Sequence, residues 1–350
     1  MRKLLFLPLS LLLFILVACG DNSEQVACEA NYYETNDYYE TYQPDEPETE
    51  ELPEDIEEVY EQMPHALDIH GLLSYVEYNG NRAYIFGSMH LGRPYFFPLA
   101  DVVEQAMRNA DIFAFEFDIV ALEDFATIMA VAGYMMLPMG TTLADVLPPQ
   151  THAHLLDVLD SFPLVDYDDI AMFQPMAAST IIVTSEVFPL MDISEVYSVD
   201  VYVLDIAQEL GRPIIGLNPL DHEMRLLYAA PLDVQIAAID GLTDRDTMIE
   251  AALDLGLVEA YAGQDMDALL AMLRSYYEYQ LDAYSRYMID VILIQRSIEF
   301  AEEIHRLLAE TDEPTTFFVT MGIGHMLGDD HGNVFVVLEE MGHTITPLWQ

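Results

Sequence analysis

The chain contains little cysteine, little tryptophan and almost no positive charge. Its 350 residues include two cysteines, one tryptophan and a single lysine, Lys3. Asp and Glu number 61 against 12 Lys and Arg, so the formal net charge at pH 7 is −49. A surface this acidic repels phosphate backbones and anionic lipid headgroups, which argues against nucleic acid as a partner. The simplest explanation of the charge is adaptation of an exported protein to its surroundings.

One long apolar run is present, at the start of the chain. Residues 4–18 follow Arg2-Lys3 and are too few for a comfortable transmembrane helix. The run ends in Leu16-Val17-Ala18-Cys19-Gly20, which resembles a bacterial lipoprotein signal. The resemblance implies cleavage before Cys19 and acylation of this residue, with the protein held at the outer face of the cytoplasmic membrane. An ordinary signal peptide or an uncleaved anchor remains the alternative.

Residues 19–63 are acidic and rich in tyrosine, and residues 21–63 contain no lysine or arginine. This composition predicts a disordered spacer between the lipid anchor and a folded domain. If Cys19 is acylated, Cys28 is the only remaining thiol, and no internal disulfide can form. The folded domain is expected over residues 64–350.

Strand and helix patterns alternate in this domain. Two strand patterns, 72–78 and 82–86, flank the hairpin signal Asn79-Gly80-Asn81. The other expected strands are 112–117, 213–217, 316–320 and 344–348, and the expected helices include 98–109, 200–209 and 334–341. Mostly helical stretches at about 122–191 and 234–309 predict a cap. We therefore expect an α/β fold with a central, mostly parallel sheet, flanking helices and a large helical insertion.

A Gly-x-x-His phrase occurs at both ends of this domain. Gly87-Ser88-Met89-His90 and Gly322-Ile323-Gly324-His325 each follow an apolar strand pattern, and Gly87 and Gly322 are expected to permit a sharp turn. Ligands of open α/β sheets bind at the carboxyl ends of the strands. We predict that His90 and His325 share a metal site there. The alternative is that each histidine hydrogen-bonds its own strand-end turn.

Acidic and basic candidates complete the predicted site. Glu116 ends an apolar strand and is expected to be a metal ligand or the general base that activates water. Imidazole and carboxylate ligands suit Zn²⁺, Mn²⁺ or Co²⁺. Asp118 would face the same side if the strand continued, and it could then orient a histidine. Arg296 is expected to pair with a buried carboxylate or hold a substrate carboxylate, or else to form a surface salt bridge.

Two further residues are secondary candidates. Asp200 opens a predicted helix, and we expect it to be an N-cap rather than a ligand. Asn218 offers a weak oxygen ligand, although a turn before Pro219 is the simpler explanation.

These phrases, taken in order, resemble the TraB/GumN family, which includes the Tiki proteins. The resemblance rests on residues 84–92, 115–118, 142–147, 261–264 and 322–328. It implies a fold related to erythromycin-esterase-like and ChaN-like proteins. It also implies a metal-dependent hydrolase site built from two histidines and an acidic residue, since Tiki members are described as metal-dependent peptidases.

The chain departs from that family pattern at three places. Asn218 stands where the family usually has glutamate, and Glu223 stands where it usually has glutamine. The family's Arg-Asn pair is Arg296-Ser297. Losing the carboxylate at position 218 removes a candidate ligand or base, for which Asp221, His222 or Glu223 could compensate.

The sequence therefore predicts a divalent-metal-dependent hydrolase that acts on a small peptide or another small molecule. His90, His325 and Glu116 would hold the metal, while Glu116 and Arg296 would act in catalysis. The rival prediction is a non-catalytic lipoprotein of the same fold that sequesters a peptide, a metal or haem. A structural surface protein with a vestigial site is a third possibility.

Overall fold

The computed structural model describes residues 68–90, 92–187, 198–252, 255–271, 282–328 and 332–349. The predicted signal segment, Cys19 and the predicted spacer lie outside these residues. A six-stranded sheet forms the centre, in the order β4-β3-β5-β2-β1-β6. The strands are β1 (Ser74–Tyr78), β2 (Asn81–Ser88), β3 (Ile112–Phe117), β4 (Ile214–Asn218), β5 (Thr316–Gly322) and β6 (Thr346–Pro347).

Four neighbouring strands of this sheet are parallel. β2 and β3 both pair in parallel with β5, and β3 also pairs in parallel with β4. β1 is antiparallel to both β2 and β6. The central strands β2 and β5 are buried almost along their whole length, as their nearly continuous apolar sequences require. The predicted α/β fold with a mostly parallel sheet is confirmed.

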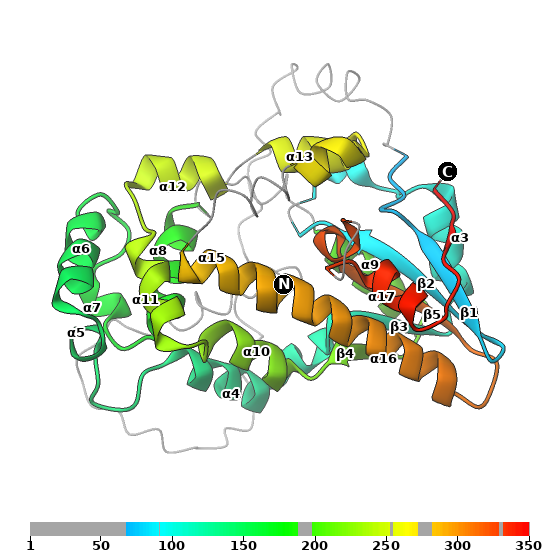
Figure 1. Cartoon of the computed structure of the whole chain (residues 1–350), viewed down its shortest axis with the longest axis horizontal. Coiled ribbons are helices and arrows are strands. Elements are labelled where there is room, and N and C mark those ends of the chain that lie inside the picture. Colours follow the sequence, from blue (N-terminus) through cyan, green and yellow to red (C-terminus); the bar gives the residue numbers. More distant parts are fainter. Residues whose placement is uncertain are drawn as a thin grey trace, which may run out of the picture.

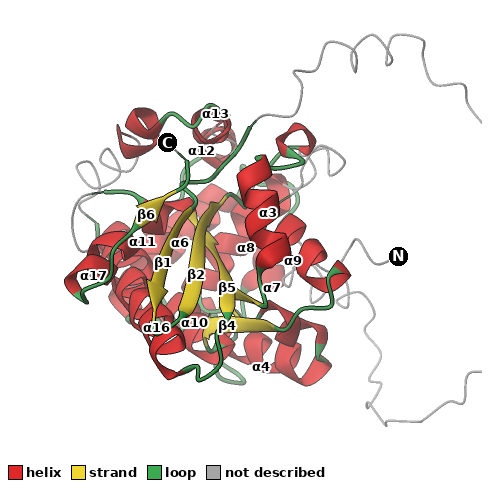
Figure 2. Cartoon of the chain, turned by 90° about the vertical axis from the view of Figure 1, so that its right-hand side faces the viewer, coloured by secondary structure: helices red, strands yellow, loops and turns green. Residues whose placement is uncertain are grey.

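Helices cover both faces of the sheet (Figure 2). On one face lie α3 (Asp101–Asn109) and α9 (Val199–Glu209), and on the other lie α16 (Arg296–Glu310) and α17 (Val334–Glu340). The short helices around the sheet are η2 (Pro94–Phe96), η3 (Ile119–Glu123) and η7 (Ile323–Met326). The apolar side chains of these elements form one continuous core with the strands.

A group of helices extends beyond the sheet (Figure 1). These helices are α4 (Phe125–Met135), α5 (Leu143–Val146), α6 (Pro149–Leu159), α7 (Tyr167–Ile170), α8 (Pro175–Val187), α10 (Leu220–Tyr228), α11 (Leu232–Asp240) and α12 (Arg245–Ala252). They share a second core that includes Leu143, Leu155, Ile182 and Ile239. This group forms a cap with its own apolar interior.

The predicted cap range 234–309 divides between the two cores. Ile239 and Leu242 belong to the cap core. Tyr261 of α13 (Leu255–Ala262) and Phe300 of α16 pack into the core of the sheet. α15 (Ala283–Tyr287) and the π-helix η6 (Met288–Gln295) continue into α16, so one helical run joins the cap to the sheet (Figure 1). Within the described ranges no helix is both long and apolar enough to cross a bilayer.

Candidate functional site

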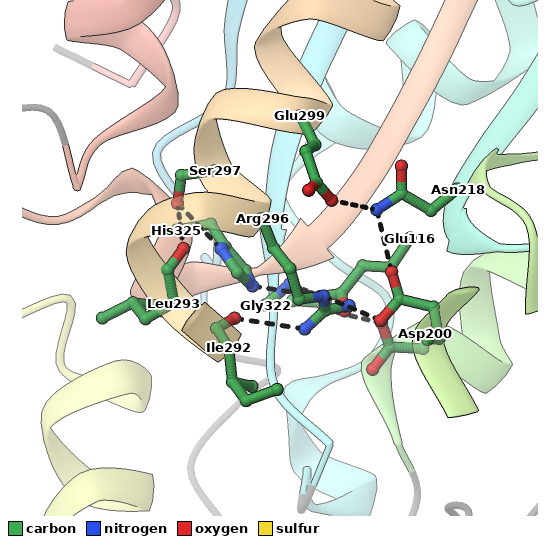
Figure 3. A network of polar contacts seen from close by, with 12 residues as sticks. Glu116, Asp200, Asn218, Ile292, Leu293, Arg296, Ser297, Glu299, Gly322 and His325 are labelled. Atoms are coloured by element: carbon green, nitrogen blue, oxygen red, sulfur yellow. Dashed lines mark hydrogen bonds and ion pairs between the residues drawn. The ribbon is translucent and has the colours of Figure 1, made fainter. Parts of the chain in front are cut away.

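The carboxyl ends of the four parallel strands lie along one edge of the sheet. Ser88 ends β2, Phe117 ends β3, Asn218 ends β4 and Gly322 ends β5. Because these strands are parallel and paired in register, polar residues at or just beyond their ends gather at this edge. Figure 3 shows the resulting cluster, into which α16 projects Arg296.

Glu116 lies at the centre of this cluster, with its side chain 13% exposed. Its Oε1 accepts a 2.7 Å hydrogen bond from the backbone N–H of Gly322, and its Oε2 lies 2.6 Å from Nη2 of Arg296. Burial alone would raise the pKa of Glu116. The nearby Arg296, His325 and His90, together with the Gly322 N–H, outweigh burial and hold this pKa well below its ordinary value. The side chain is therefore a carboxylate at neutral pH.

His325 lies beside Glu116 as a neutral imidazole. Its Nδ1 lies 2.9 Å from the hydroxyl oxygen of Ser297, and that hydroxyl donates a 2.8 Å hydrogen bond to the carbonyl of Leu293. Since the hydroxyl proton is already used, Nδ1 must carry the proton that joins the ring to Ser297. Burial lowers the pKa of His325 to about 4. The lone pair of Nε2 therefore faces Oε1 of Glu116, at 3.8 Å.

The π-helix η6 supplies the carbonyl groups that support this arrangement. The side chain of Ser297 bonds the Leu293 carbonyl, and Nη1 of Arg296 lies 3.4 Å from the Ile292 carbonyl. A π-turn leaves carbonyl groups free that an α-helix would use for its own ladder, and such turns often occur at functional sites. The irregular helix thus fixes the first two residues of α16, which are the two that enter the cluster.

His90 lies at the solvent side of the cluster, with its side chain 61% exposed. Its Nδ1 is 2.8 Å from Oδ2 of Asp200, whose Oδ1 accepts a 2.6 Å hydrogen bond from the Ser88 hydroxyl. Asp200 raises the pKa of His90, although water screens part of this effect because the ring is exposed. The Nε2 of His90 has no hydrogen-bond partner among the described residues.

Asp200 is therefore not the N-cap that the sequence led us to expect. Ser198 is the N-cap of α9, because its hydroxyl accepts the N–H of Asp200. The Asp200 carboxylate points back to β2 and holds His90 and Ser88 instead. Burial would raise the pKa of Asp200, but His90 and Ser88 hold it below its ordinary value. This carboxylate takes the histidine-orienting role that the sequence suggested for Asp118.

Glu223 supplies the carboxylate that position 218 lacks. The residue is 2% exposed, and its Oε2 lies 2.8 Å from Nε of Arg296. The angle at Nε does not meet hydrogen-bond geometry, so the contact is an ion pair rather than an aligned hydrogen bond. Burial raises the pKa of Glu223, while Arg296 and Asn218 oppose that rise. Of the three residues considered as compensation, Glu223 is the one that points at Arg296.

Asn218 and Glu299 extend the cluster towards the cap. The Asn218 amide donates to Glu223 at 2.9 Å and to Glu299 at 3.1 Å, so both carboxylates face its amino group. Nε2 of His222 lies 2.9 Å from the same Glu299 oxygen. Sequence reasoning did not single out Glu299. Glu299 follows Arg296 by three residues, so both lie on one face of α16. This spacing could have identified Glu299 as a candidate site residue.

Three predicted details differ from the structure. β3 ends at Phe117, and Asp118 caps η3 by accepting the Ala121 N–H at 3.2 Å, so it does not lie against a histidine. Gly87 lies inside β2 rather than in a turn. Gly322 has φ −54°, so it does not need a glycine-only conformation. Gly87 instead serves close approach, because a Cβ there would lie 3.0 Å from the Gly71 carbonyl oxygen. A Cβ on Gly322 would lie 3.4 Å from Glu116 Oε1, which is an ordinary contact distance.

The donor chemistry of the cluster fits a divalent metal, although a complete ligand set is not preformed. Within the described parts of the chain, no group of three or more His, Cys, Asp or Glu side chains is arranged to hold a metal ion. The 3.8 Å between His325 Nε2 and Glu116 Oε1 is within twice the usual metal–ligand distance of about 2.1 Å. His90 and His325 each bond a polar group through Nδ1, as metal-binding histidines do.

The fold and this edge define an α/β protein with a largely buried carboxylate, two histidines and an arginine at the edge where open α/β sheets bind their ligands. A family model matches residues 72–347, and the chain belongs to the TraB/PrgY/gumN family. No curated protein and no solved structure shows significant similarity to the chain.

Proposed function

We propose that the chain is a divalent-metal-dependent hydrolase of peptides, held by a lipid on Cys19 at the outer face of the cytoplasmic membrane. The observation that carries the proposal is the approach of two acceptor atoms, His325 Nε2 and Glu116 Oε1, at 3.8 Å. Arg296 already pairs with Oε2 of Glu116, and the Gly322 N–H bonds Oε1. A neutral imidazole nitrogen and a carboxylate oxygen at this spacing are the kinds of donor that a divalent metal takes.

In this proposal His325, Glu116 and His90 hold the metal, which is Zn²⁺, Mn²⁺ or Co²⁺. A bound metal would supply Lewis-acid polarisation of the scissile carbonyl. Arg296 keeps Glu116 ionised, and Ser297 fixes the tautomer of His325. Asp200 orients His90 through Nδ1, which leaves Nε2 of this exposed ring as the atom that would bind the metal.

Peptide hydrolysis is tested with the full chain in detergent, supplied with each of the three metals and a fluorogenic peptide library. Glu116→Gln and His325→Ala should each lower kcat/KM by about 100-fold or more. Asp118→Asn is the matched control, since it lies two residues from Glu116 but outside the cluster, and it should keep activity within about twofold. Full activity in both cluster variants would contradict the proposal. Metal binding without turnover would favour the binding-protein alternative.

The membrane tether has its own test. Cys19→Ala should move the protein from the membrane fraction to the soluble fraction of the producing cell, because the acyl chains are its proposed attachment. Retention of the variant in the membrane fraction would instead indicate an uncleaved apolar anchor at residues 4–18.

A further inference from the structure

Arg93 lies on the same loop as His90, three residues further along the chain. It is the N-cap of η2, and its carbonyl accepts the Phe96 N–H at 2.9 Å. Its side chain is partly buried. The segment that follows β2 therefore carries a cation three residues after the exposed histidine of the proposed active site.

Aromatic contacts hold the segment that follows Arg93. The Phe97 ring stacks on Tyr202 of α9, with ring centroids 4.4 Å apart. The Phe96 ring packs against Tyr261 of α13 at 5.8 Å, and the Tyr261 hydroxyl donates to the Gly87 carbonyl at 2.8 Å. α9 is the helix whose Asp200 holds His90, and Gly87 lies in the strand that leads to His90. Arg93 is thus anchored to the elements that position the histidine.

The charge environment of Arg93 is unusual for this molecule. The chain has a formal net charge of −49, and most arginines of the described ranges pair with a carboxylate. These paired arginines are Arg82, Arg108, Arg212, Arg225, Arg245, Arg296 and Arg306. Among the described residues Arg93 has no ion pair and no side-chain hydrogen bond. As far as the described ranges extend, no carboxylate of the chain occupies this guanidinium, so an external anion can bind it.

The guanidinium of Arg296 is not available to an external anion in the same way. Its guanidinium bonds Glu116 and pairs with Glu223, and its side chain is only 9% exposed. The other charged groups at this edge include Asp200 and Glu299, which repel an anion. A substrate carboxylate that approaches the cluster therefore finds its favourable partner at Arg93 rather than at Arg296.

We propose that Arg93 binds a carboxylate group of the substrate, so that the preferred substrates are short peptides with a free carboxylate beyond the scissile bond. This inference rests on the proposed peptide hydrolase function. Guanidinium and carboxylate form two parallel, charge-assisted hydrogen bonds, which fix both the position and the direction of the ligand. The carboxylate belongs to the C-terminus of the peptide or to an acidic side chain.

The test compares three versions of one fluorescent peptide: with a free C-terminus, with an amidated C-terminus, and amidated with one added glutamate. Dissociation constants are measured by fluorescence anisotropy on the full chain in EDTA, so that binding is read without turnover. Wild type should bind a carboxylate-bearing peptide about tenfold more tightly than the neutral amide. Arg93→Gln should lose this preference, and Arg93→Lys should recover part of it.

Arg108→Gln is the control, because Arg108 is an exposed arginine that pairs with Glu104, and the preference should survive. A preference for the free C-terminus or for the added glutamate identifies which carboxylate is bound. Equal binding of all three peptides by wild type, no binding at all, or a preference that persists in Arg93→Gln would overturn the proposal. Discrimination in EDTA with no hydrolysis of any peptide would refute the hydrolase function alone.

Discussion

Glu223 and Arg296 form a buried ion pair, with 2.8 Å between Oε2 and Nε. The family pattern that the sequence resembles has glutamate at the position of Asn218 and glutamine at the position of Glu223, so a carboxylate and an amide have changed places in this chain. The carboxylate now reaches Arg296 from α10 instead of from the end of β4. Asn218 keeps contact with the cluster by donating to Glu223 at 2.9 Å.

This exchange predicts a compensating pair of substitutions. Glu223→Gln removes one of the two carboxylates that contact the buried guanidinium of Arg296, while Glu116 remains paired with it. The free energy of unfolding should fall by about 2 kcal/mol, less than for a buried charge left without a partner. Restoring the usual family arrangement with Asn218→Glu in the same chain should recover most of that loss. Urea denaturation of the three proteins measures the effect. A double variant no more stable than Glu223→Gln would show that the two positions do not substitute for one another.

Asp200→Asn tests how His90 is held. An asparagine cannot stabilise a charged imidazole, and its amide can present a donor instead of an acceptor to Nδ1. Loss of such an outer partner typically weakens metal binding by about 10-fold to 100-fold. Competition with a metal-sensitive dye measures this affinity. The matched control is Asp205→Asn on the same helix, for which we expect unchanged affinity; equal loss in both variants would remove Asp200 from the site.

A histidine pair away from the site predicts a pH dependence of stability. His343 is 7% exposed, and its Nε2 lies 2.8 Å from Nδ1 of His305, with Tyr78 packed against both rings. Burial, and then the neighbouring His305, lowers the pKa of His343 below its ordinary value. In acid the unfolded chain gains a proton that the folded chain resists. The stabilisation is therefore complete above the unfolded-state pKa and is lost as pH falls below it.

The measurement is the free energy of unfolding at about pH 7.5 and about pH 5.5, since these values bracket the ordinary histidine pKa. Wild type should lose more stability between them than His343→Gln does. His154→Gln is the control, because His154 lies on α6 of the cap and its Nε2 lies 3.0 Å from the Leu242 carbonyl oxygen, not from a second histidine. Equal losses in wild type and His343→Gln would mean that the pair does not carry the effect.

Two glycines should respond to alanine in opposite directions. A Cβ on Gly216 of β4 would lie 2.2 Å from the backbone nitrogen of Asp118, so Gly216→Ala must separate β4 from the end of β3. A Cβ on Gly133 of α4 meets nothing within 4 Å. Gly133→Ala should therefore stabilise the protein by about 0.5–1 kcal/mol through helix propensity. Thermal denaturation of both variants checks this; a stable Gly216→Ala would contradict the tight packing at the site edge.

The order of elements was predictable from the sequence, because strand and helix carry different apolar periods. The expected strands at 112–117, 213–217 and 316–320 correspond to β3, β4 and β5. From the two Gly-x-x-His phrases we also predicted correctly that His90 and His325 lie at the edge formed by the carboxyl ends of the parallel strands. The final strand is shorter than expected, since β6 is only Thr346–Pro347.

The partners inside the cluster could not be predicted in the same way. Whether Asp118, Asp200 or Glu223 faces the site depends on where a strand stops and how a helix is rotated, and one residue changes both. β3 stopped one residue before Asp118, which became a cap. The π-helix η6 could likewise not be predicted from the sequence, because its apolar residues follow no period that distinguishes it from an α-helix. The position of the Gly-x-x-His phrases after strands therefore predicted where the site lies. Tertiary packing determines which other side chains belong to it.

The most direct test of the account is the metal content of the purified full chain, measured by inductively coupled plasma mass spectrometry. Wild type dialysed against Zn²⁺, Mn²⁺ and Co²⁺ in turn should retain about one equivalent of one of them. His325→Ala and Glu116→Gln should retain essentially none, while Asp118→Asn should match wild type. Wild type that retains no metal, or cluster variants that retain as much as wild type, would contradict the metal-dependent hydrolase.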